Sequence, residues 1–77
     1  MNIVAQNIWF DKERIFALLN NGKVVGMPLV WFPSLHIATD EQRSKVEYWS
    51  EGAWLHWEEL DEDISAEGFL KFSKSVV

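Results

Sequence analysis

The chain has 77 residues, which is too few for two hydrophobic cores, so we expect a single domain spanning residues 1–77. It contains no cysteine, which excludes disulfides, thiolate metal sites and cysteine nucleophiles. The net charge is −5, from 12 acidic and 7 basic residues, and the basic residues are scattered singly, so we expect no direct binding to nucleic acid.

The first half of the chain predicts β-structure. Three segments rich in β-branched and aromatic side chains are separated by short polar breaks, at 3–10, 14–19 and 24–27. Asn21-Gly22 is typical of a two-residue type I′ turn, which would place Leu18 opposite Val25. Both faces of this hairpin are apolar, so we expect each face to be covered.

Two prolines mark the next segment as a connector. Pro28 cannot donate to a β-ladder, and Pro33 disfavours helix at the residue before it, so we expect the apolar residues between them to be extended. A short helix then follows Thr39, whose hydroxyl can form a capping box with Gln42. We expect this helix to end near Lys45 or Val46.

A second hairpin is predicted to turn at Glu51-Gly52. Its register places Trp49 opposite Trp54 and Glu47 opposite His56. An aromatic cross-strand pair contributes about 0.5–1 kcal/mol beyond simple burial.

The last part of the chain predicts an acidic turn, from Glu58 to Asp63, and then a C-terminal helix. Ser65 is the expected helix cap, and Ile64 and Phe69 have the spacing of a hydrophobic staple. The predicted fold class is therefore α+β: a small antiparallel sheet built from two β-hairpins, with one short connecting helix and a C-terminal helix.

Three short motifs carry a family resemblance: PLVWFP at 28–33, HW at 56–57 and LDEDIS at 60–65. With them, the chain resembles, over roughly residues 10–70, a family of small bacterial proteins catalogued as domain of unknown function 2442. Glu58 stands where a proline often follows the HW pair in that family. The resemblance implies a small α+β domain, and members that can be encoded beside a second small protein in pairs that look like toxin–antitoxin modules. It implies no catalytic residue.

The residues themselves favour no reaction either. The acidic turn with His56 and His36 has suitable metal-ligand types but lacks metal-ligand spacing, so we expect no metal site and no cofactor. His56, Asp61 and Ser65 include the residue types of a nucleophilic triad, but Ser65 is better explained as a helix cap. We interpret His56 as a strand histidine paired with Glu47 and expect that the chain is not an enzyme.

The five tryptophans leave three alternatives open: core packing, a surface for a protein partner, or a cage for a cationic ligand. Our leading hypothesis is a non-catalytic interaction domain that binds a protein partner or a second copy of itself, with an antitoxin-like partner of a small basic protein as one form. The alternative is a small-ligand or metal-binding site around Trp57. The candidate partner-binding residues are Trp31, Phe32, Trp54, His56, Trp57, Asp61, Glu62 and Asp63.

No apolar run approaches the ~20 residues that a membrane-spanning helix needs, and the N-terminal residues do not have the pattern of a signal peptide. We therefore expect a cytoplasmic protein without a membrane partner.

Overall fold

The computed structural model of the protein describes residues 2–75. In chain order its elements are β1 (Ala5–Phe10), β2 (Arg14–Leu19), β3 (Val24–Pro28), the 3-10 helix η1 (Leu29–Trp31), α1 (Pro33–His36), α2 (Asp40–Ser44), β4 (Glu47–Trp49), the 3-10 helix η2 (Ser50–Gly52), β5 (Trp54–Trp57), β6 (Glu62–Ser65) and α3 (Ala66–Ser75).

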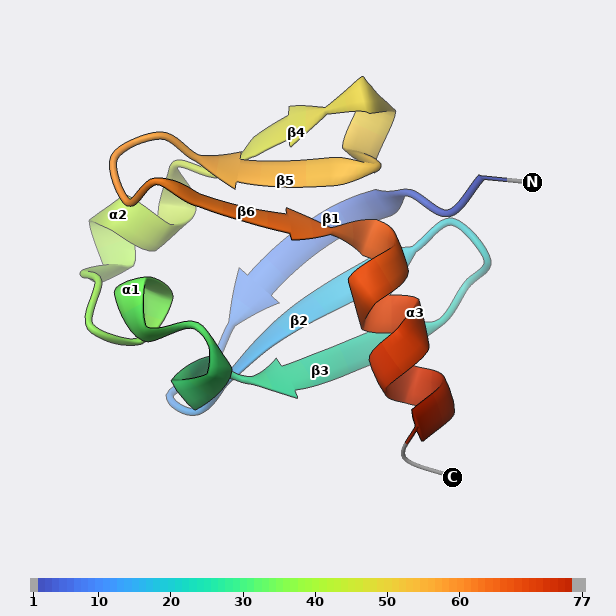
Figure 1. Cartoon of the computed structure of the whole chain (residues 1–77), viewed down its shortest axis with the longest axis horizontal. Helices are drawn as coiled ribbons and strands as arrows, with labels where there is room; N and C mark the ends of the chain where they lie inside the picture. The colour runs from blue at the N-terminus through green and yellow to red at the C-terminus, as the bar shows by residue number, and fades with distance from the viewer. Residues whose placement is uncertain (1, 76–77) are drawn as a thin grey trace.

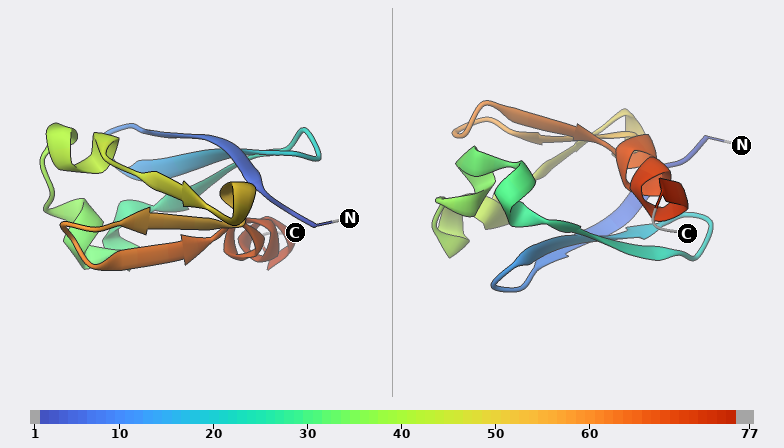
Figure 2. Two further views of the ribbon diagram at one scale, coloured as in Figure 1. Left: turned by 90° about the horizontal axis from the view of Figure 1, so that it is seen from above. Right: turned by 60° about the horizontal axis from the view of Figure 1, so that its bottom comes forward.

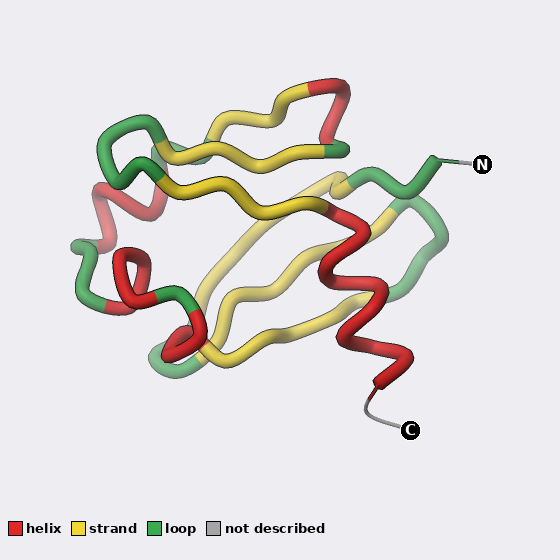
Figure 3. The backbone as a smooth tube through the Cα atoms, viewed as in Figure 1, coloured by secondary structure: helices red, strands yellow, loops and turns green. Residues whose placement is uncertain are grey.

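The strands form two antiparallel sheets, ordered β1-β2-β3 and β4-β5-β6, and α3 packs against β3 and β2 of the first sheet (Figure 1). The short helical turns η1, α1 and α2 connect the two sheets (Figure 3). The predicted α+β class, with two hairpins and a C-terminal helix, is confirmed. Each hairpin has its own sheet, which a third strand completes, and β6 includes residues that we had assigned to the acidic turn.

One hydrophobic cluster lies between the two sheets, which face each other in side view (Figure 2). Both sheets, η1, α1 and α3 contribute to it, and its buried members are Ala5, Ile15, Ala17, Leu19, Val25, Met27, Leu29, Leu35, Leu55, Trp57, Ile64, Ala66 and Phe69. Since period-2 alternation gives each strand one inward face, every sheet also keeps an outer face. No helix within residues 2–75 is long and apolar enough to cross a membrane.

The loop of the first hairpin differs from the predicted type I′ turn. Leu19 N donates to Lys23 O at 2.9 Å, and Gly22 N donates to Leu19 O at 3.0 Å. Within the three residues between that pair, Gly22 alone has a positive φ, of 87°. This is the arrangement of a three-residue loop with glycine in the left-handed position, whereas type I′ requires two positive φ values.

The extra loop residue shifts the register of this hairpin by one. Leu18 therefore faces Val24, and Phe16 faces Gly26. Because side chains alternate along a strand, the shift turns Val25 to the core, and leaves Phe16 outside. Trp9 stacks on Phe16 with ring centroids 5.6 Å apart, so this outer face covers itself in part with its own aromatic rings.

The segment after Pro28 is helical rather than extended. Pro28 precedes the first residue of η1, and Pro33 is the first residue of α1. The prediction was wrong because proline is also well tolerated at the first position of a helix, where its missing N–H has no intrahelical partner.

The two predicted helix caps are confirmed. Gln42 N donates to Thr39 Oγ1 at 3.1 Å and Thr39 N donates to Gln42 Oε1 at 2.9 Å, which completes the capping box of α2. Gly68 N donates to Ser65 Oγ at 3.1 Å at the start of α3. Ser65 is thus both the last residue of β6 and the cap of the helix.

Candidate functional site

The outer face of the second sheet, formed by β4, β5 and β6, brings together two tryptophans, a histidine and two carboxylates. The register of β4 and β5 is the predicted one, with Trp49 opposite Trp54 and Glu47 opposite His56. On the other side of β5, His56 lies opposite Asp63 of β6. Leu55 and Trp57, which alternate with these residues along β5, point to the core. We call the outer set Glu47, Trp49, Trp54, His56 and Asp63 the Trp49–Trp54 face.

His56 is held between two carboxylates beneath an indole ring. Its Nδ1 contacts Asp63 Oδ1, and its Nε2 lies 2.6 Å from Glu58 Oε1. The ring stacks on Trp49 at 4.0 Å between centroids, and this cover leaves His56 only 7% exposed. A neutral imidazole has one N–H, so donation to both carboxylates requires the protonated ring. The hydrogen bonds to Asp63 and then to Glu58 raise the pKa of His56 above its usual 6.5, against the opposing effect of burial.

The predicted partner of His56 has another role. Glu47 is the cross-strand neighbour of His56, but its Oε1 accepts a hydrogen bond from Trp49 Nε1 at 2.9 Å. Trp49 is therefore fixed twice, by this bond at its edge and by His56 against one face of its ring.

These contacts predict a pH-dependent contribution to stability. Because the pKa of His56 is raised in the folded state, its ion pairs stabilise the fold below pH 6.5, and that stabilisation is lost as the pH rises through the folded-state pKa. We expect His56→Gln to lower the free energy of unfolding more at about pH 6 than at about pH 9. Chemical denaturation of both proteins at the two pH values measures this. A double-mutant cycle of His56→Gln with Asp63→Asn is the control. The coupling free energy between His56 and Asp63 should decrease as the pH rises, and a coupling free energy that increases with pH contradicts the assignment.

The two opposed tryptophans are exposed and border a hollow. Trp49 is 47% exposed and Trp54 is 49% exposed. Together with Asp63 they line a hollow of about 310 Å³. Burial of such rings against a partner is favourable, and tryptophan is enriched among residues that dominate binding at protein interfaces.

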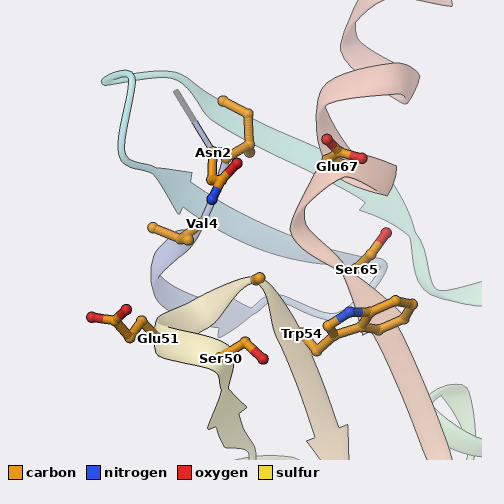
Figure 4. Close-up of a pocket in the computed structure, with 9 residues that line it drawn as sticks. Asn2, Val4, Ser50, Glu51, Trp54, Ser65 and Glu67 are labelled. Atoms are coloured by element: carbon orange, nitrogen blue, oxygen red, sulfur yellow. The ribbon is translucent and has the colours of Figure 1, made fainter.

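Trp54 also borders a second hollow, of about 500 Å³, between the N-terminal segment, η2 and the start of α3. Figure 4 shows Trp54, Ser65 and Glu67 on one side of this hollow and Asn2 and Val4 on the other. Glu51 and Glu67 also belong to its lining, so this hollow too is acidic.

Trp57, the centre of the alternative ligand site, lies in the core. It is 1% exposed, its Nε1 donates to Arg43 O at 3.0 Å, and Phe10 packs edge-on against it at 6.4 Å between centroids. Its ring does not reach the Trp49–Trp54 face, because neighbouring residues of a strand point to opposite sides of the sheet.

The remaining candidate residues lie elsewhere. Asp61 is a turn residue with φ of 51°, and Glu62 Oε1 accepts a hydrogen bond from Ser34 Oγ at 2.6 Å, which joins β6 to α1. Trp31 is 54% exposed and packs edge-on against Phe72. It belongs to η1, which follows β3 and lies away from the β4–β5 turn (Figure 1), and Phe32 is the next residue in the chain.

Three of the eight candidates therefore come together: Trp54, His56 and Asp63. The structure adds Trp49, Glu47 and Glu58, which the candidate set omitted. The predicted register already placed Trp49 and Glu47 on this face, so cross-strand pairing was the signal that could have found them.

No group of three or more His, Asp or Glu side chains in residues 2–75 is arranged to hold a metal ion. The closest approach to one, His56 with Glu58 and Asp63, uses both ring nitrogens as hydrogen-bond donors. A protonated imidazole has no lone pair for a metal.

These features define a small α+β domain with an open aromatic and acidic face. The family model described as "Protein of unknown function (DUF2442)" matches residues 5–75, so the chain belongs to this family, as its motifs indicated. A crystal structure of a protein of unknown function from Rhodospirillum rubrum ATCC 11170 is similar, with a TM-score of 0.73 and 31% sequence identity over 94% of this chain and 89% of that one. Comparison with curated proteins gives no match.

Proposed function

We propose that this protein is a cytoplasmic, non-catalytic interaction domain that binds a basic protein through the Trp49–Trp54 face. The observation that carries the proposal is the placement of two half-exposed indoles next to each other among carboxylates. Residues that dominate binding at interfaces are typically large aromatic side chains on a supported, well-packed surface. Here the support is rigid, because Trp49 is fixed by both Glu47 and His56.

The charge of the chain supports a basic partner. The net charge is −5; at the face, Glu58 and Asp63 hold the His56 imidazolium, and Glu47 adds a further carboxylate beside Trp49. Lys45, which precedes β4 in the chain, is engaged within the chain, because its Nζ lies within 4 Å of the Glu41 and Glu59 carboxylates. Complementary charge accelerates encounter and selects against wrong partners.

The family of this chain indicates where to look for that partner. Members of the family can be encoded beside a second small protein, in pairs that look like toxin–antitoxin modules. We therefore propose as partner the small basic product of a gene next to that of this chain, a toxin-like protein that this acidic chain would neutralise.

A small-ligand site is the second candidate, and the 310 Å³ hollow favours it. Its centre would be Trp49, Trp54 and Asp63 rather than the buried Trp57. The hollow is at the lower end of the ~300–1,000 Å³ that small-molecule pockets occupy, which favours a side chain of a larger partner over a free ligand.

The test is a calorimetric titration of the adjacent gene product with this chain and with Trp49→Ala/Trp54→Ala. We expect the wild type to bind and the double variant to bind about 100-fold more weakly, as expected for two residues that dominate an interface. Val24→Ala/Val30→Ala is the matched control, because both valines are exposed on other elements and their loss should leave the affinity unchanged. Equal affinities for the wild type and the tryptophan double variant would exclude this face as the binding surface.

A further inference from the structure

We propose that the hollow between Trp49, Trp54 and Asp63 receives one arginine side chain, whose guanidinium group stacks on indole and donates to the Asp63 carboxylate. The identification of that arginine as part of a protein partner rests on the function proposed above. The hollow and its chemistry are properties of this chain alone, so they can be tested without the partner.

The indole walls of the hollow are exposed and held in place. Trp49 and Trp54 are directly opposed across β4 and β5, and each keeps about half of its surface exposed. One face of Trp49 is already occupied by His56, and its Nε1 is bound to Glu47, so the ring cannot rotate into the hollow and fill it. A flat aromatic wall that is fixed before binding attracts a cation through its ring quadrupole at little cost in side-chain entropy.

The Asp63 carboxylate is only partly engaged. Asp63 lines the hollow, and its side chain is 53% exposed although its Oδ1 contacts His56. Among the side chains that the structure describes, up to residue 72, Asp63 Oδ2 has no hydrogen-bond or ion-pair partner. An acceptor that is oriented by one partner and has a second oxygen available can form a charge-assisted hydrogen bond with a guanidinium N–H.

The local charge at this face is negative. The carboxylates of Glu58 and Asp63 contact the one imidazolium, and a third carboxylate, that of Glu47, accepts from Trp49 Nε1. The balance stays negative even with His56 protonated, so an incoming cation is attracted at every pH at which the carboxylates are ionised. A neutral or anionic side chain gains nothing from this field.

The shape and hydration of the cation select arginine over lysine. A guanidinium group is planar, delocalised and more weakly hydrated than an ammonium group, so it can stack on an indole and still donate in its own plane. Lysine presents a strongly hydrated point charge that loses its water in a hollow with a single acceptor. The lining of two flat rings and one carboxylate matches the planar ion.

The experiment is an NMR titration of the whole chain with Nα-acetyl-arginine methylamide, observed at the indole N–H signals. We expect saturable shifts at Trp49 and Trp54 in the millimolar range, and none at Trp31. The matched probe is Nα-acetyl-citrulline methylamide, which has the same shape without the charge and should bind about ten-fold more weakly. Equal binding of the two probes, or tighter binding of the corresponding lysine derivative, would overturn the assignment.

Three variants separate direct contact from the general field. Trp54→Ala should abolish the shifts at Trp49, and Asp63→Asn should weaken binding about five-fold or more through loss of a charged acceptor. Glu58→Gln is the control, because it removes an equal charge that touches His56 but does not line the hollow. If Glu58→Gln weakens binding as much as Asp63→Asn, the carboxylate contact is wrong.

The failure of this inference is distinguishable from the failure of the proposed function. If a partner binds through the Trp49–Trp54 face but the arginine probe does not bind, the arginine site is wrong and the proposed function stands. If the probe binds but the adjacent gene product does not, the arginine site is supported and the partner assignment is wrong.

Discussion

Gly52→Ala is expected to lower the free energy of unfolding by about 3 kcal/mol, which for a domain of this size corresponds to a fall of about 12–24 °C in Tm. A methyl group on Gly52 would lie 2.3 Å from the Ala5 carbonyl oxygen, and that oxygen belongs to backbone that cannot rotate away. The residue also has a φ of 104°, a conformation that costs L-residues about 1–2 kcal/mol. The β4–β5 turn would have to separate from β1.

Gly22→Ala is the matched control, and thermal unfolding of both variants gives the measurement. Gly22 has a similar φ of 87°, but nothing lies within 4 Å of the position that its methyl group would take. It should therefore show only the conformational cost, about 1 kcal/mol. Equal losses in the two variants would mean that the close approach of Gly52 to β1 does not exist in solution.

The two hairpins show what local chemistry predicts about register. In the second hairpin, Trp49 pairs with Trp54 as predicted, although the 3-10 helix η2, and not a two-residue turn, connects the strands. In the first hairpin, Asn21-Gly22 fits both a two-residue and a three-residue loop, and the two differ by one position in register. Because both faces of this hairpin are apolar, either register buries a set of apolar side chains, and the hydrophobic pattern does not decide between them.

β6 could not be predicted from its own residues. Glu62 and Asp63 are unusual in strands, and only their partners explain them: Ser34 for Glu62, and His56 for Asp63. Both contacts join segments that are distant or separated by a turn, so a linear pattern does not contain them. The same reason explains why His56 was assigned to Glu47, its neighbour in register, and not to Asp63 across the turn.

Trp57→Ala is expected to cost about 3–5 kcal/mol, which leaves little of the stability of a domain this small. Trp57 is 1% exposed, and it joins three parts of the chain: its own strand β5, Phe10 of β1, and the Arg43 carbonyl of α2. Arg43 in turn places its guanidinium over the Phe10 ring, at 5.5 Å from the centroid. Removal of the indole leaves a cavity between the sheets and a carbonyl without its donor.

Chemical denaturation of two further variants shows how much of the loss in stability comes from the hydrogen bond and how much from the buried ring. Trp57→Phe keeps most of the apolar volume and removes only the hydrogen bond to Arg43, so we expect an intermediate loss of about 1–2 kcal/mol. Trp54→Ala removes a half-exposed ring on the opposite side of the same strand and should cost about 1 kcal/mol or less. If Trp54→Ala destabilised the chain as much as Trp57→Ala, the inward and outward faces of β5 would be exchanged. Since alternation along β5 separates the two tryptophans, Trp57 supports the Trp49–Trp54 face from below, and we expect any loss of the proposed binding in Trp57→Ala to reflect unfolding and not a lost contact.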